Sequence, residues 1–292
     1  MRAVTLYVVS DLHGAFDDLH KAVPEGATLV LLGDLINLVD YFSMTGILTE
    51  VFSPEAVAEV VRLRAEQRFE DAWRVIRNRS AGREDEVRTR IGELVREQYD
   101  AFFSTLSRKT YLILGNVDNP PVALELASGH PDVHLVDGKV VSIEGERFGF
   151  VGGALPTPLH VAGEISEEEM RAKVEGLDEC NVLCSHIPPD VPELCFDTVS
   201  GKSERGSRDL LEYIRDVEPR VAYFGHVHQP LVSVMSLGPT RCINVGYFRG
   251  TKRAWPHTTA PPRAVTAQPP AGRAVLMSKS EIDWLPAPPR KD

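Results

Sequence analysis

The chain of 292 residues has few cysteines, and no two of them form a CxxC pair. Four cysteines are too few to act as the disulfide scaffold of a protein of this length. Cys180 and Cys184 flank an apolar run, which favours buried thiols over a metal-binding knuckle. We therefore expect free, buried cysteines.

The sequence also lacks a long apolar run and an excess of basic residues. No stretch approaches the roughly 18 apolar residues that a membrane helix needs. Residues 1–10 are apolar but lack the cationic start and small-residue cleavage site of a signal peptide. The charged residues, 32 Lys and Arg against 42 Asp and Glu, give a net charge of −10, which counts against a nucleic-acid partner. We expect a cytoplasmic protein with no membrane partner and no nucleic-acid partner.

The amino-terminal part has the pattern of a parallel α/β sheet. Residues 2–10 are rich in Val, Leu and Tyr and predict a buried strand. A polar turn at 11–14, a short helix to about residue 22 and a second buried strand at 28–32 follow. A strand, a helix and a strand in close succession are typical of a sheet with parallel strands.

A helical segment, residues 53–106, then interrupts this pattern. Ser53-Pro54 is a good helix start, with a capping hydroxyl followed by proline at the first helical position. Apolar residues recur at helical spacing on both sides of a turn at residues 80–82. We therefore predict a helical hairpin inserted into a single domain that spans residues 1–292.

The α/β pattern resumes after the insertion. Strands are predicted at 110–114, 140–143, 148–151, 181–185, 221–224, 231–236 and 241–245, with helices at 166–175 and after Gly206-Ser207. Residues 254–272 are dense in Pro, Thr and Ala and predict a long irregular loop. Short strands at 274–277 and 282–284 are expected to return to the sheet.

Five short motifs each follow directly on an apolar strand. They are Asp11-Leu12-His13, Gly33-Asp34, Gly115-Asn116-Val117-Asp118, Ser185-His186 and Gly225-His226-Val227-His228. Side chains just past the carboxyl ends of such strands converge on one crevice, and O and N donors gathered there suit a pair of metal ions. Glycine before three of the ligands lets the backbone turn sharply and approach an ion. In an extended segment, Asp-x-His and His-x-His would place both side chains on one face.

Each motif taken alone has an ordinary explanation. Asp-x-His and Gly-Asp are frequent in surface turns, and His-x-His could be a separate metal site. Their occurrence together, in this order and at strand ends, favours a single metal centre. The remaining histidines are expected to be surface or core residues: His20, His130, His134, His160 and His257.

The ordered set of motifs resembles the calcineurin-like metallophosphoesterase superfamily over about residues 3–247, outside the hairpin. His186-Ile187-Pro188-Pro189, the helix start at Gly206-Ser207 and Asn244-Val245-Gly246 are most similar to the predicted phosphoesterases related to the cyclic-nucleotide phosphodiesterase Icc. The resemblance implies an α/β fold in which two mixed β-sheets pack as a sandwich flanked by helices.

The resemblance also implies roles for the motif residues. Asp11, His13 and His228 would bind one metal ion, Asn116, His186 and His226 would bind a second, and Asp34 would bridge both. The mixed Asp/Asn/His shell suits Mn²⁺, with Fe or Zn²⁺ as alternatives, rather than Ca²⁺. Hydroxide held by the two metal ions would attack the phosphorus of the ester. The predicted catalytic residues are Asn116, Asp118 and His186.

One position departs from the family pattern. Many members carry a histidine after the Gly-Asn pair that protonates the leaving oxygen or steadies the transition state, whereas this chain has Val117. Asp118 is retained and could only orient its neighbours. The leading hypothesis is a phosphodiesterase that acts on a small or nucleotide-like diester. A phosphomonoesterase or protein phosphatase, and a metal-binding regulatory module with weak turnover, are the alternatives, and a homo-oligomer is left open.

The two ends of the inserted hairpin lie beside predicted ligands, because it leaves after Asp34 and returns before Asn116. That position suits a lid or a wall of the substrate pocket, with Asn37, Tyr41 and Phe42 at its base. The alternative is a helical pair packed for stability or dimerisation, because apolar stripes need a partner surface.

Overall fold

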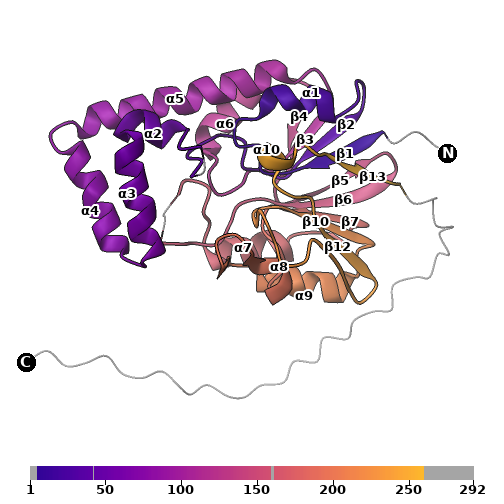
Figure 1. Cartoon of the computed structure of the whole chain (residues 1–292). Coiled ribbons are helices and arrows are strands. Elements are labelled where there is room, and N and C mark those ends of the chain that lie inside the picture. Colours follow the sequence, from indigo (N-terminus) through magenta and orange to yellow (C-terminus); the bar gives the residue numbers. More distant parts are fainter. Residues whose placement is uncertain (1–4, 42, 159–160, 260–292) are drawn as a thin grey trace, which may run out of the picture. The chain divides into compact units, whose positions relative to one another are not determined.

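The computed structural model of the chain describes residues 5–41, 43–158 and 161–259 (Figure 1). The chain divides into a compact unit of residues 1–260 and a segment of residues 261–292, and the segment lies outside the described residues. The compact unit is an α/β fold with two mixed sheets flanked by helices, as the sequence predicted. Within the described part, no helix has the length and apolar composition that crossing a bilayer requires.

The first sheet has five strands in the order β13-β1-β2-β3-β4. Its parallel strands are β1 (Leu6–Val9), β2 (Thr28–Leu31), β3 (Thr110–Leu112) and β4 (Val133–Leu135). The edge strand β13 (Trp255–His257) runs antiparallel to β1, with Leu6 opposite His257. The parallel strands therefore end at one edge of the sheet, where the first three motifs begin.

The second sheet has six strands in the order β11-β12-β10-β7-β6-β5. They are β5 (Lys139–Ile143), β6 (Glu146–Val151), β7 (Val182–Ser185), β10 (Val221–Phe224), β11 (Val234–Leu237) and β12 (Thr240–Asn244). The four central strands are parallel, and β5 and β11 are antiparallel at the edges. A separate short pair, β8 (Phe196–Asp197) and β9 (Lys202–Ser203), lies outside both sheets.

The sheets pack face to face around an apolar core. Leu6, Val8, Val30 and Leu32 of the first sheet belong to the same buried cluster as the inward side chains of the second sheet, Phe148 and Phe150 among them. Both phenylalanines are fully buried, and truncating such a side chain to alanine costs about 3–5 kcal/mol. The core therefore sets the spacing of the two sheet edges at which the motifs meet.

Helices cover the outer faces of both sheets (Figure 1). A short 3-10 turn (Phe16–Asp18), α1 (Leu19–Ala22) and α6 (Pro120–Ala127) contribute to the apolar cluster over the first sheet. The second sheet is covered by α7 (Glu167–Glu175) and α9 (Arg208–Val217), with the one-turn α8 (Pro192–Cys195) beside them. The helices α7 and α9 are capped by Ser166 and Ser207, whose hydroxyls accept the N–H groups of Glu169 and Leu210.

The insertion contains three helices rather than the two arms of a hairpin, and a further short helix directly precedes it. The preceding helix is α2 (Ile47–Phe52), and the insertion contains α3 (Pro54–Ala65), α4 (Phe69–Ser80) and α5 (Glu84–Thr105). Ser53 adopts φ +70° and separates α2 from α3, and Gln67 adopts φ +59° in the turn between α3 and α4. A positive φ interrupts a right-handed helix, and periodicity alone does not reveal it. The predicted turn after Ser80 is present.

Several other predictions can be compared with the described residues. The antiparallel pair β5–β6 and all four buried, free cysteines are confirmed. The prediction of an irregular loop from residue 254 is wrong at its start, because Trp255–His257 form β13. Pro256 suits that edge strand, where a missing N–H costs little. Residues 260–272 and the predicted strands at 274–277 and 282–284 lie outside the described residues.

Candidate metal centre

The carboxyl ends of five strands bring the predicted ligands together. Two groups of donors form, each with one ligand atom per residue and all of those atoms within 4.8 Å of one another. The first group is Asp11, His13 and His228, and the second is Asp34, His186 and His226. Asn116 joins the second group, because its Oδ1 lies 3.0 Å from Nε2 of His186 and 3.0 Å from Nδ1 of His226. The structure therefore places all seven predicted ligands in one location.

The carboxylate of Asp34 lies between the two groups. Its Oδ2 is 3.6 Å from Nε2 of His13, and its Oδ1 is 3.5 Å from Nε2 of His186. In the first group, Nε2 of His228 is 3.2 Å from Nε2 of His13 and 3.4 Å from Oδ1 of Asp11. Two acceptor nitrogens that face each other with carboxylate oxygens alongside are a donor set for a divalent transition metal. The residues present therefore fit two metal ions that share Asp34.

The backbone at the ligands is unusual. Asp11, His13, Asp34 and His226 have φ values of 56°, 42°, 55° and 67°, in the left-handed region that non-glycine residues seldom adopt. The Asp11–His13 segment is therefore not extended, and the one-face spacing of an extended Asp-x-His does not apply. The side chains of Asp11 and His13 converge because the chain turns at both residues, and such strained positions cluster at functional sites.

Two glycines permit the close approach that the sequence predicted. A Cβ on Gly115 would collide with Oδ1 of Asp34, and a Cβ on Gly225 would collide with Oγ of Ser10 and Oδ2 of Asp11. Any larger residue at either position would displace a ligand carboxylate. The glycines are therefore needed for space at the ligands.

Further hydrogen bonds orient the side chains of the predicted ligands. Nδ1 of His186 lies 2.7 Å from the carbonyl oxygen of Leu32, which accepts its proton and leaves Nε2 free to bind a metal ion. The backbone N–H of His226 donates to Oδ2 of Asp11 at 3.0 Å, which ties a histidine motif to the first aspartate. The ring of His13 is hydrogen-bonded to the backbone of Ile36. These contacts hold the donor atoms toward the centre.

The pKa values of the metal-free centre follow from burial and from the crowding of like groups. Burial, together with neighbouring histidines, lowers the pKa of His13 and of His226 to about 3, so both rings are neutral at physiological pH. Burial raises the pKa of Asp34 to about 7, with the charge of Asp11 adding to the effect. Burial opposes ionisation of Asp11 and of His228, but their mutual hydrogen bond lowers the first pKa and raises the second.

Asp118 supports the turns that carry two ligands. Its fully buried carboxylate accepts the backbone N–H groups of Asp34, Leu35 and Gly115 at 2.9, 3.0 and 2.8 Å. Burial raises the pKa of Asp118, whereas the N–H groups of Gly115 and Leu35 and the hydroxyl of Tyr99 lower it. Its acceptor sites are engaged with protein donors, so the carboxylate is placed to orient its neighbours.

Residues of the segment 244–249 also contact the centre, and their roles were not predicted. The ring of Tyr247 stacks on His228, with 4.1 Å between ring centroids and an interplanar angle of 8°. Nδ2 of Asn244 donates to the carbonyl oxygens of Gly225 and Val227, which holds the His-x-His loop. Arg249 donates from its backbone to the carbonyl oxygen of Asp11 at 3.1 Å. The Asn-x-Gly pattern at 244–246 was the one signal in the sequence that pointed to this segment.

Arg249 also joins the centre to the loop before the insertion. Its Nε is 2.9 Å from Oδ2 of Asp40, and its Nη2 donates to Oγ1 of Thr45 at 3.2 Å. Its Nη1 donates to the carbonyl oxygen of His13. The guanidinium is therefore engaged on all three nitrogens.

The other histidines lie apart from the ligands, as predicted for those that the structure describes. His257 is buried against Glu146 and Tyr223, His130 stacks on Phe103, His134 lies against Tyr111, and His20 is exposed. His160 lies outside the described residues.

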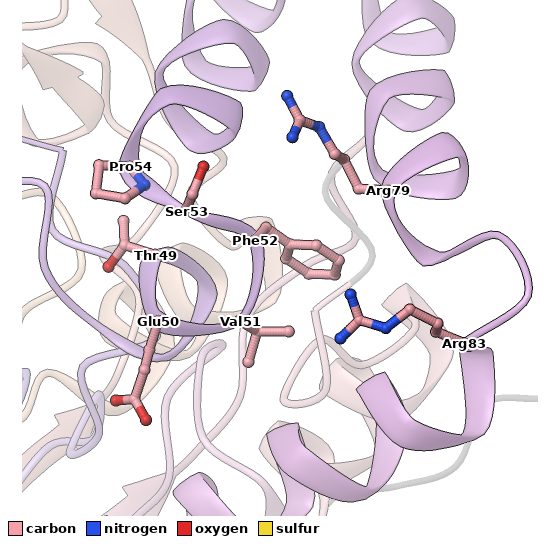
Figure 2. Close-up of a pocket in the computed structure, with 8 residues that line it drawn as sticks. All are labelled: Thr49, Glu50, Val51, Phe52, Ser53, Pro54, Arg79 and Arg83. Carbon is pink, nitrogen blue, oxygen red and sulfur yellow. The ribbon is translucent and has the colours of Figure 1, made fainter.

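A cavity of about 430 Å³ lies between the junction of α2 with α3 and the turn from α4 to α5, away from the predicted ligands. It is lined by Thr49, Glu50, Val51, Phe52, Ser53, Pro54, Arg79 and Arg83, and Figure 2 shows both guanidinium groups directed toward Phe52 and Ser53. Arg83 also pairs with Glu86, and both arginine side chains are exposed. No predicted ligand lines this cavity, so it is separate from the metal centre.

The chain is similar to known proteins in sequence and in fold. The family model for calcineurin-like phosphoesterases matches residues 4–230. One crystal structure is similar in fold, with a TM-score of 0.54 and 18% identity over 83% of this chain and 90% of that chain. The crystal structure of TT1561 of Thermus thermophilus gives a TM-score of 0.48 and 15% identity over 84% of this chain and 89% of that chain. No curated protein matches significantly. Because the family model covers most of the sequence, the chain belongs to the calcineurin-like phosphoesterase family.

Proposed function

We propose that the chain is a two-metal phosphodiesterase that hydrolyses a small or nucleotide-like diester. The observation that carries the proposal is Asp34, whose two carboxylate oxygens each face one of the donor groups. Mn²⁺ is the proposed ion, with Fe or Zn²⁺ as alternatives. Divalent ions held there would activate water and neutralise charge on the phosphoryl group.

The protonation states of two histidines and the orientation of Asn116 suit this chemistry. His13 and His226 are neutral at physiological pH, so they lose no proton when they bind a metal ion. Oδ1 of Asn116 faces the two histidines of its group, which directs the amide NH₂ elsewhere. That NH₂ makes no hydrogen bond that the structure records among the described residues, and we propose that it donates to a phosphoryl oxygen of the substrate.

The charge of the substrate favours a diester over a monoester. A monoester dianion carries a second negative charge, and a cationic side chain in addition to the metal ions would be needed to neutralise it. Arg249 is the arginine that contacts the His13 loop, but its guanidinium is engaged with Asp40, Thr45 and a backbone carbonyl. It is therefore not placed to neutralise that second charge.

The chemical character of the chain supports a small substrate. A net charge of −10 disfavours binding to nucleic acid or to an anionic membrane. The four cysteines are free and buried, which is compatible with the reducing conditions of the cytoplasm. We propose a cytoplasmic enzyme on these grounds.

The test compares a p-nitrophenyl monoester with a bis-p-nitrophenyl diester, which share a leaving group, in the presence of Mn²⁺. We expect the higher kcat/KM for the diester, together with bound metal in the same preparation. A preference for the monoester would replace the proposal with a phosphomonoesterase or protein phosphatase. Bound metal with no turnover of either ester would replace it with a regulatory module.

A further inference from the structure

The long helix of the insertion contacts the loops that carry metal ligands. Tyr99, in α5, is fully buried. Its hydroxyl donates to Oδ1 of Asp118 at 3.0 Å and accepts the backbone N–H of Asn119 at 2.7 Å. The hydroxyl of Tyr99 therefore both donates and accepts a hydrogen bond in the segment that follows Asn116.

Asp118 links Tyr99 to the two loops that carry Asp34 and Asn116. Its carboxylate accepts the N–H groups of Asp34 and Leu35 from one loop and of Gly115 from the other. Tyr99 supplies the remaining donor of the four that the structure records for this buried carboxylate. A buried carboxylate that loses a donor reorients or takes up a proton, and either change would shift the turns that it holds.

The neighbouring residue of α5 holds the same loop farther along. Oε1 of Gln98 accepts the N–H of Asn37 at 2.6 Å, and its Nε2 donates to the carbonyl oxygen of Asn37 at 3.3 Å. Tyr99 and Phe102 also belong to the buried cluster that contains Leu35 and Ile36. The loop from Asp34 to Asn37 is therefore packed and hydrogen-bonded against α5.

We infer that Tyr99 is a positioning residue of the metal centre and that α5 is a structural part of that centre. The inference rests on the proposed function, because it assumes that Asp34 and Asn116 bind metal ions. Tyr99 acts through Asp118, which holds the backbone of Asp34 and Gly115 in place. Outer contacts of this kind commonly change metal affinity or activity by about 10–100-fold when they are removed.

The test uses Tyr99→Phe in the full-length chain and measures Mn²⁺ affinity and stoichiometry by calorimetry. We expect Mn²⁺ binding to weaken by about 10–100-fold. The matched control is Tyr213→Phe in α9, which loses a hydroxyl that donates to the carbonyl oxygen of Asp178 at 2.7 Å. Tyr213 belongs to the apolar cluster over the second sheet, so its variant should lose stability and keep the Mn²⁺ affinity of the wild type.

A second variant keeps the inference testable if Tyr99→Phe does not fold. Gln98→Met removes the clamp on Asn37 at a half-buried position and should also weaken Mn²⁺ binding, by several-fold. Wild-type Mn²⁺ affinity in the folded α5 variants, with Tm lowered as in Tyr213→Phe, would overturn the inference and leave the proposed function intact. A wild-type protein that binds neither Mn²⁺, Fe²⁺ nor Zn²⁺ would contradict the proposed function itself.

Discussion

Asp34 faces both donor groups, and its protonation state should control how tightly the empty centre binds metal. Burial raises its pKa to about 7, and the hydrogen bond to Asp11 raises the pKa of His228 against the effect of burial. His13 and His226, with pKa values of about 3, have already lost their protons in that range. Protons on Asp34 and His228, two of the predicted ligands, should therefore compete with metal ions near neutral pH.

We predict that Mn²⁺ affinity rises as pH increases through about 7, because a metal ion binds the carboxylate of Asp34 and not the carboxylic acid. Binding near the pKa of Asp34, about 7, should release protons. Calorimetric titrations in buffers with different ionisation enthalpies measure both quantities. An affinity that falls as pH rises through this range, or that stays constant, would contradict the pKa assigned to Asp34.

Val117 should make the reaction sensitive to the leaving group. Its half-buried side chain provides no acid, and its backbone N–H already donates to Oδ1 of Asp34 at 3.0 Å. Aryl diesters should react far faster than alkyl diesters, because a positioned acid contributes about 10²–10⁴-fold. In Val117→His, alkyl diesters should gain selectively. Rates over a series of leaving groups test this, and equal rates with chemistry rate-limiting would mean that another residue supplies the proton.

Among the elements, the edge strand β13 is held by a buried chain of hydrogen bonds that joins the two sheets. Nε2 of His257 lies 2.9 Å from Oε2 of Glu146, and its Nδ1 lies 3.0 Å from the hydroxyl of Tyr223. Arg220 donates to the other oxygen of Glu146 at 2.8 Å. A neutral imidazole satisfies this chain, because it donates to the carboxylate and accepts from the phenol.

We predict that this chain of hydrogen bonds loses stability in acid. Burial lowers the pKa of His257 below its usual 6.5, so folding favours the neutral ring. The contribution is fully present above pH 6.5 and declines as pH falls below it, because the unfolded chain then takes up the proton. The lowered pKa of Glu146 adds a further loss as pH falls below its usual 4.5.

Chemical denaturation of the wild type and of His257→Leu, both freed of metal ions with a chelator, measures this loss of stability. Below about pH 6.5, the free energy of unfolding should fall more steeply in the wild type, because the other histidines contribute to both proteins. At neutral pH the variant should be less stable by about 1–3 kcal/mol, since Glu146 loses a partner. Parallel pH profiles in the two proteins would exclude His257 as a source of the acid sensitivity.

The sequence predicted the helices and strands whose caps, turns and alternation involve residues that are close together in the chain. Ser166 and Ser207 cap helices through N–H groups three residues away, and alternation with a Gly145 turn defines β5–β6. The break at Gln67 and the strand around Pro256 depend on contacts that periodicity and composition do not carry. Pro256 is typical of a loop in the sequence, but in the structure its segment pairs with β1 as an edge strand.

Across the whole molecule, the predicted ligands lie in local sequence motifs, whereas the residues that support them are brought there only by the fold. The convergence of the seven predicted ligands could be expected because each follows a strand in a short motif, and parallel strands bring their ends together. Arg249 contacts the carbonyl oxygen of His13 across 236 positions in the chain, and Tyr99 reaches Asp118 from a helix in the insertion. Neither residue lies in a motif, so only the folded chain reveals its role.

The insertion should contain parts with different functions. Replacing α3 and α4 (residues 54–80) with a short Gly-Ser loop leaves α5 and its contact with Asp118 in place. We predict that this variant keeps its metal ions and its turnover of aryl diesters, whereas replacing residues 53–106 removes Tyr99 and loses both. Metal analysis of the two proteins, with circular dichroism as the folding control, decides this. Retention of metal by the larger deletion would contradict a role for α5 in the metal centre.

The most direct test of the two-metal centre is diffraction at the manganese absorption edge from crystals grown with Mn²⁺. We predict two anomalous peaks about 3.5–4 Å apart, one on each side of the Asp34 carboxylate. One peak should lie among Asp11, His13 and His228, and the other among Asn116, His186 and His226. Asp34→Asn should reduce the occupancy of both. A single peak in fully active protein, or peaks away from Asp34, would contradict the account.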